Sequence, residues 1–192
     1  MKPVRSLALA AVAVLVAGPA LAHPGHVADT LAAGLMHPLT GVDHILAMAA
    51  VGLMAAQRGG KALWLWPAAF VAAMLAGYGL GAAQPGAPMF EPGVLASVMV
   101  LGALVAAQAQ VPLAAGAGLI GAFGLCHGYV HGAESPAGAG LAFPIGFALA
   151  TAGLHGAGIA AGLSARRIGR DQLVRLAGGG VTVAGLVLAL AG

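Results

Sequence analysis

Apolar residues along this chain do not alternate with polar ones but form runs of about 20 residues, the length at which a helix crosses a bilayer. Short polar or Gly/Pro-rich breaks separate the runs. A transmembrane barrel would instead alternate apolar and polar residues with a period of two. The pattern predicts an all-α, polytopic membrane protein with six transmembrane helices, at approximately 29–55, 62–83, 92–108, 111–132, 139–163 and 172–191.

The first 22 residues have the pattern of a signal peptide. Lys2 and Arg5 precede a short apolar run, which ends in Ala20-Leu21-Ala22, a small-x-small cleavage site. The alternative is an uncleaved first helix. We expect cleavage after Ala22, which leaves residues 23–192 as one six-helix transport domain with His23 at its N-terminus.

Composition supports a membrane location, because only 7% of the residues are charged whereas soluble domains average about 25%. With an exported N-terminus, the basic residues of the first and fifth loops face the cytoplasm, as the positive-inside rule expects. They are Arg58, Lys61, Arg166, Arg167 and Arg170. The sequence thus predicts an N-out, C-out protein of the bacterial cytoplasmic membrane. Part of the net charge of +3 comes from the predicted signal peptide, so it does not indicate a nucleic-acid partner.

Small residues and tryptophans carry structural expectations. Glycines four residues apart let helices approach closely, and such pairs occur at Gly77/Gly81, Gly124/Gly128, Gly128/Gly132 and Gly158/Gly162. Trp64 and Trp66 stand at the start of the second span, which is typical of an interfacial belt.

The polar residues inside the spans carry the chemistry. Asp43 and His44 lie well inside the first span, and an ionised Asp there costs about 2.5–3.5 kcal/mol, so it indicates a functional site. His37 lies seven residues before His44 and should share its helix face. Pro38 and Gly41, between them, could loosen the helix. A purely structural role for Asp43, as a hydrogen bond between helices, is the alternative.

The fourth span contributes a second group, Cys126-His127-Gly128-Tyr129-Val130-His131-Gly132-Ala133-Glu134. His127 and His131 are four residues apart and Glu134 follows three later, so all three side chains share one helix face. Paired imidazoles at this spacing bind a metal ion on a helix. Interfacial hydration is the alternative for His131 and Glu134.

Three further histidines are weaker candidates. His155 lies in the fifth span and is a ligand or a hydrogen-bonded structural residue, with equal weight on each. His23 and His26 flank Pro24-Gly25 at the predicted mature N-terminus, where they either capture metal or belong to a flexible tail. We predict a stepped path, from an outer group of His37, His127, His131 and Glu134 to Asp43-His44 and then past His155.

Imidazole and carboxylate ligands suit Ni²⁺, Co²⁺ and Zn²⁺, whereas Mg²⁺ and Ca²⁺ prefer oxygen alone. These residues resemble the motifs of the HupE/UreJ family of nickel/cobalt permeases. The matching residues are His37-Pro38-x2-Gly41-x-Asp43-His44, His127-Gly128-x2-His131-Gly132-x-Glu134 and Ala150-Thr151-x2-Leu154-His155. Leu125-Cys126 departs from the aromatic residue more usual in the family.

The resemblance implies secondary uptake of Ni²⁺ or Co²⁺ as cargo, supplying hydrogenase, urease or cobalamin synthesis, without a prosthetic group or catalytic residues. The residues alone leave two rival functions open. One is an intramembrane zinc enzyme, although Gly128 stands where the helical protease motif has Glu. The other is an accessory protein that binds metal without translocating it.

Overall fold

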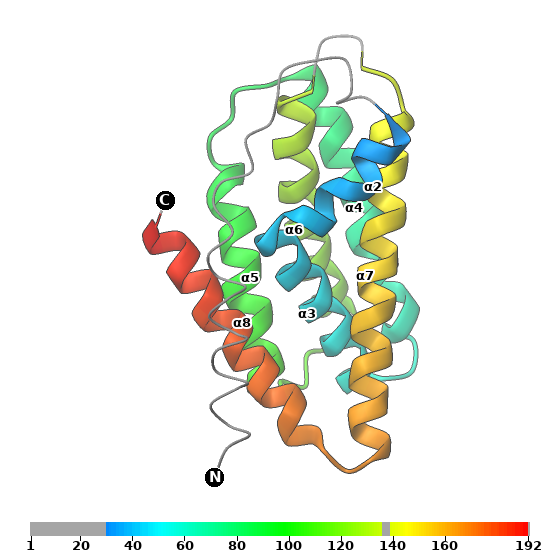
Figure 1. Cartoon of the computed structure of the whole chain (residues 1–192), viewed down its shortest axis with the longest axis vertical. Coiled ribbons are helices and arrows are strands. Elements are labelled where there is room, and N and C mark those ends of the chain that lie inside the picture. Colours follow the sequence, from blue (N-terminus) through cyan, green and yellow to red (C-terminus); the bar gives the residue numbers. More distant parts are fainter. Residues whose placement is uncertain (1–29, 136–138, 192) are drawn as a thin grey trace.

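The computed structural model describes residues 30–135 and 139–191, which form seven α-helices and no strand (Figure 1). The helices are α2 (Leu31–Thr40), α3 (Val42–Arg58), α4 (Ala62–Ala83), α5 (Phe90–Ala106), α6 (Leu113–Ala133), α7 (Ala142–Arg167) and α8 (Asp171–Ala191). The predicted all-α class is therefore confirmed. The predicted signal peptide, His23 and His26 lie outside the described residues.

Four of these helices, α4, α6, α7 and α8, are long and apolar enough to cross a membrane. The helices α2 and α3 meet the same criterion only as a pair, bent by 83° at their junction. Helix α5 is apolar but has only 17 residues. By length and composition the described residues offer four spans, or five if the bent pair crosses as one. The prediction of six therefore requires α5 to cross as well.

The bend between α2 and α3 lies at Gly41. Its backbone is extended (φ −86°, ψ 118°), so the helical path stops there, although its amide still donates to the carbonyl of His37 at 3.3 Å. The expectation that His37 and His44 share one face of a continuous helix is therefore wrong. Helices α2 and α3 meet at a corner (Figure 1), and the His37 and His44 ring centroids lie 5.5 Å apart across it.

Glycines bring α4 and α6 into backbone contact. A methyl group at Gly128 of α6 would overlap the carbonyl oxygen of Met74, and one at Gly132 would overlap that of Tyr78. Gly77 and Gly81 of α4 meet the α6 backbone in the same way. The predicted packing role of these glycines is confirmed, and the close approach places α6 histidines beside the buried face of α4.

Helix α7 forms the other wall of the core. Both α2 and α3 pack against it, and a methyl group at Gly158 would stand 2.5 Å from the carbonyl oxygen of Ala49 on α3. A methyl group at Gly162 would meet the Cβ of Ala56 at 2.6 Å. Helices α5 and α8 pack together on the opposite side of α3 (Figure 1).

The two tryptophans behave differently. Trp64 is 61% exposed, as expected of an interfacial residue. Trp66 is fully buried, its indole donates to the carbonyl of Leu113 at 3.0 Å, and its ring lies against Gly116. The interfacial role predicted for Trp66 is wrong, because the missing side chain of Gly116 makes room for the indole inside the bundle.

The two ends of the bundle carry opposite charge. The α3–α4 and α7–α8 connections lie at one end and the α4–α5 and α6–α7 connections at the other (Figure 1). The first end carries the basic residues of the α3–α4 and α7–α8 regions, whereas Glu91 and Glu134 flank the connections at the second. The charges therefore separate along the long axis of the molecule.

Candidate metal centre

Three histidines from separate helices converge inside the acidic end of the bundle. His37 lies in the last turn of α2, His44 in the first turn of α3 and His131 in the last turn of α6. One nitrogen from each ring lies within 4.8 Å of the others. The closest pair is Nε2 of His44 and Nε2 of His131, 2.7 Å apart. Two nitrogens that bind one ion at right angles, about 2.1 Å from it, lie about 3 Å apart, so this spacing suits a shared metal ion.

Asp43 orients His44 from behind. Its Oδ1 lies 3.0 Å from Nδ1 of His44, and a carboxylate only accepts hydrogen bonds, so Nδ1 carries the hydrogen. Nε2 of His44 is then the nitrogen with a free lone pair, and it is the atom that faces His131. A carboxylate behind a metal-binding histidine fixes the ring and raises the basicity of its ligand nitrogen.

Glu134 stands behind His131 in a similar way. Its Oε2 lies 3.5 Å from Nδ1 of His131, three residues earlier in the chain. The interaction with His131 holds the pKa of the Glu134 carboxyl below its ordinary value, so this side chain is ionised at neutral pH. The His131 ring is buried, whereas the Glu134 side chain is 70% exposed, so the acid reaches from the surface to the centre.

An aromatic side chain closes one side of the three histidines. The Phe147 ring, fully buried on α7, lies 5.7 Å from the His37 and His44 ring centroids and 5.2 Å from that of His131. This apolar wall keeps water from that side of the imidazoles. In such surroundings the attraction between a cation and its ligands is screened less than in water.

His127 lies beside the centre but points its Nε2 elsewhere. Its ring centroid is 4.9 Å from that of His44, while its Nε2 lies 2.9 Å from the hydroxyl of Ser97 on α5. His155 lies farther along α7, toward the end of the helix that carries Arg166 and Arg167, and is also buried. The three-histidine group therefore contains His37, His44 and His131 but neither His127 nor His155.

The predicted order of steps differs from this geometry. His44 was placed deeper than an outer group of His37, His127, His131 and Glu134. Instead the bend at Gly41 brings His44 against His131, and His127 is the histidine next to the centre. The order differs because the helix changes direction by 83° at Gly41, and the spacing of His37 and His44 in the sequence does not reveal that bend.

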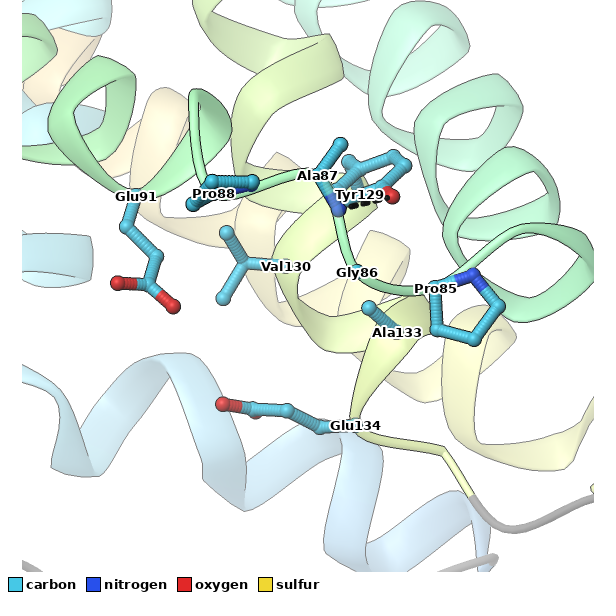
Figure 2. Close-up of a pocket in the computed structure, with 9 residues that line it drawn as sticks. All are labelled: Pro85, Gly86, Ala87, Pro88, Glu91, Tyr129, Val130, Ala133 and Glu134. Carbon is cyan, nitrogen blue, oxygen red and sulfur yellow. Dashed lines mark hydrogen bonds between the residues drawn. The ribbon is translucent and has the colours of Figure 1, made fainter.

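A cavity of about 250 Å³ leads from the centre toward the acidic end. It is lined by Asp43, His44, Glu91, Val94, Leu95, Val130, His131 and Glu134. A second hollow of about 220 Å³ lies beside it, under the loop of Pro85 to Pro88, and shares Glu91, Val130 and Glu134 with the first. Figure 2 shows the carboxylates of Glu91 and Glu134 turned toward the same space. We call the space between these two carboxylates the acidic vestibule.

Glu91 was not among the residues predicted for the site. It lies in the first turn of α5, far from the histidine motifs in sequence. The available signal was an acidic residue in the first turn of an apolar helix, on the side of the membrane where no basic residue was predicted. The amide of Ala87 donates a hydrogen bond to the Tyr129 hydroxyl at 3.1 Å, and this bond holds the overlying loop against α6 (Figure 2).

The fold and the site define a helical, multi-pass membrane protein with a buried histidine centre supported by carboxylates. Comparison with known proteins is more specific. The family described as HupE / UreJ protein matches residues 10–188, and Protein HupE of Rhizobium leguminosarum bv. viciae is 44% identical over 170 residues, 87% of this chain and 88% of its own length. No solved structure matches the chain. The chain belongs to the HupE/UreJ family.

Proposed function

We propose that this protein is a permease that imports Ni²⁺ or Co²⁺ across the bacterial cytoplasmic membrane. The observation that carries the proposal is the convergence of His37, His44 and His131, with a carboxylate behind two of them. Buried ionisable groups in a membrane are costly, and pathways for ions are where they occur. The short contact between Nε2 of His44 and Nε2 of His131 turns two potential ligand atoms toward the same space.

The ligand set favours the proposed cargo. Imidazole nitrogens suit Ni²⁺, Co²⁺ and Zn²⁺, while an all-oxygen site would suit Mg²⁺ or Ca²⁺. Membership of the HupE/UreJ family supports nickel and cobalt among these metals, and a transporter or accessory role over an enzyme. The metal is the transported substrate and no prosthetic group is needed.

Charge supports the direction of transport. If the basic end of the bundle faces the cytoplasm, the acidic vestibule opens outside, where Glu91 and Glu134 attract divalent cations. A divalent ion moving inward gains about 4.6 kcal/mol per 100 mV of inside-negative potential. This gradient suffices for accumulation without ATP hydrolysis by the chain.

The test is uptake of radiolabelled Ni²⁺ and Co²⁺ into proteoliposomes that contain the purified protein and carry an inside-negative potential. His44→Ala should abolish uptake, because it removes a central ligand. Asp43→Asn should weaken metal binding by about 10- to 100-fold, the usual cost of losing such a support. Gly118→Ala is the matched control, since a methyl group there meets nothing within 4 Å.

Uptake that survives both His44→Ala and Asp43→Asn would contradict the mechanism. Metal binding to the wild-type protein without any uptake would instead favour an accessory protein that does not translocate. Running the same assay with Zn²⁺ separates the three metals.

A further inference from the structure

Two histidines outside the three-histidine centre have buried ring nitrogens without hydrogen-bond partners among the described residues. They are His127, through Nδ1, and His155, through both Nδ1 and Nε2. The two side chains are 0% and 1% exposed. Buried polar groups in proteins are nearly always paired, so three unpaired nitrogens in one region need an explanation.

The Ser97 hydroxyl determines which nitrogen of His127 is free to bind. Ser97 Oγ donates its one hydrogen to the carbonyl of Val94 at 2.6 Å, within the same helix. It must then accept at its contact with Nε2 of His127, so that nitrogen carries the ring hydrogen. Nδ1 of neutral His127 is left with a buried lone pair that accepts no hydrogen bond from the described residues, and such a lone pair can bind a metal ion.

His155 lies on the same face of α7 as the wall of the centre. Phe147, Thr151 and His155 follow one another at four-residue intervals, so His155 is about 12 Å along the helix from Phe147. Thr151 does not pair with it, because its hydroxyl is directed at the sulfur of Met74 at 3.7 Å. The helix therefore connects the centre to a second buried imidazole farther from the acidic vestibule.

One aromatic ring contacts both histidines. Phe70 of α4 is fully buried, and its ring centroid lies 5.5 Å from that of His127 and 5.1 Å from that of His155. With the contact between His44 and His127, the rings form a continuous series from the centre to His155. Phe70 is the only apolar member of the series, so a cation moving along it must pass this ring.

A cavity lies on the far side of His155. It measures about 380 Å³ and is lined by Leu63, Pro67, Ala68, Val71, Ala152, His155, Gly156 and Ile159. Pro67 has no N–H, so the carbonyl oxygen of Leu63 lacks its usual helical donor. Thus His155 borders a space that also offers a backbone oxygen, near the basic end of the bundle.

We propose that the region around Phe70 holds a second, inner binding position for a divalent transition-metal ion, with Nδ1 of His127 and a ring nitrogen of His155 as ligands and the Phe70 ring as the movable barrier before His155. This inference rests on the proposed transport function. It gives two of the three unpaired nitrogens a metal ion to bind and places a release position between the centre and the basic end.

The direct test replaces His155 with a soft ligand and uses Co²⁺ as the probe. Purified His155→Cys protein saturated with Co²⁺ should show a thiolate-to-metal charge-transfer absorption, because thiolate binds such metals strongly. The matched control is Gly153→Cys, two residues earlier on α7, where a side chain meets nothing within 4 Å. Cys126, present in every variant, sets the background.

The ligand-field bands of Co²⁺ bound by imidazole report whether the three-histidine centre is filled. If they appear in His155→Cys without the thiolate-to-metal absorption, the inner position is overturned. Co²⁺ that fails to bind the wild-type protein would instead overturn the proposed function. The two failures are therefore distinguishable.

Transport supplies an independent readout. His155→Ala should lower Co²⁺ uptake by about tenfold or more, a loss typical of groups that support a metal site, with Co²⁺ affinity at the centre unchanged. Phe70→Leu, which keeps the core apolar and shortens the barrier, should raise the uptake rate. Wild-type rates in both variants would contradict the proposal even if the cysteine variant did not fold.

Discussion

At the scale of single residues, the centre depends on which nitrogen of each histidine is free. Asp43 holds Nδ1 of His44, and Ser97 holds Nε2 of His127, so the two neighbouring rings present opposite nitrogens. Nε2 of His44 faces the three-histidine centre, whereas the His127 ring lies beside Phe70. Under the proposed function, these small polar partners determine which ring nitrogen is available to a cation.

Gly41 should be required for this arrangement. A methyl group there would stand 2.9 Å from Nδ1 of His44 and 3.0 Å from Oδ1 of Asp43, so both side chains would have to move. We expect Gly41→Ala to weaken Co²⁺ binding by about 10- to 100-fold, measured by titration of the purified protein. Gly79→Ala, where the methyl group meets nothing within 4 Å, is the control. Equal affinities in the two variants would contradict this role.

Glu91 should affect the capture of the metal ion at the acidic vestibule and leave the later steps of transport unchanged. It lines both parts of the acidic vestibule but is not one of the three clustered ligands. Glu91→Gln removes one negative charge without changing the shape of the side chain. We expect a higher KM for Ni²⁺ uptake with little change in maximal rate, and a weaker dependence of KM on ionic strength. An unchanged KM at low salt would exclude Glu91 from capture.

Most site residues were predictable one by one because they are polar residues in apolar segments. His37, Asp43, His44, His127, His131 and Glu134 were all proposed on that ground. Ser97 and Phe147 were not, because a serine or a phenylalanine in an apolar helix has no unusual cost to attract notice. Their roles depend on neighbours from other helices.

At the scale of elements, the breaks between apolar runs predicted the helices closely, because Pro and Gly end helices by local chemistry. The predicted 62–83 coincides with α4, and 111–132 lies close to α6. The first span is the exception. Its predicted range, 29–55, covers α2 and most of α3. Whether Gly41 kinks or breaks a helix depends on what the two halves pack against, here α7.

Helix packing should be as sensitive as the ligands. Gly128→Ala places a methyl group into the Met74 carbonyl and should destabilise the bundle by about 1–3 kcal/mol or more, as overpacking does. Thermal unfolding in detergent would show a lower midpoint, and uptake should fall because His127 and His131 move with α6. Gly118→Ala on the same helix has free space and should unfold like the wild type. A shared midpoint for both variants would refute the packing role.

At the scale of the whole molecule, opposite charges at the two ends and a series of imidazoles between them define one axis. The acidic vestibule, the three-histidine centre and the cavity beside His155 follow one another along it. Under the proposed function, few strong ligands at each position favour release as well as binding.

Uptake should depend on pH through the histidines. Metal binds neutral imidazole, and burial favours the neutral ring, so protonation should remove ligands and lower uptake only on the acid side of the ordinary imidazole pKa of about 6.5. Glu134 should not contribute in this range, because its pKa lies below the ordinary value and its carboxylate persists. Initial rates of Ni²⁺ uptake from pH 7.5 to 5.5, at fixed membrane potential, would measure this. In Glu134→Gln the acid limb should move to lower pH, because the carboxylate 3.5 Å from Nδ1 of His131, which favours the protonated ring, is removed; an unmoved limb would show that His131 does not control it.

The sequence by itself determined the helical membrane class, the limits of most helices and the residues with metal chemistry. These follow from local quantities, namely apolar length, helix-breaking residues and the cost of polar groups in lipid. Only the tertiary structure decided that His44 meets His131, that Asp43 bonds the nitrogen of His44 that faces away from His131, and that Glu91 joins the acidic vestibule. Those relations arise from the 83° turn at Gly41 and from backbone contact at glycines, and both depend on packing between helices distant in sequence.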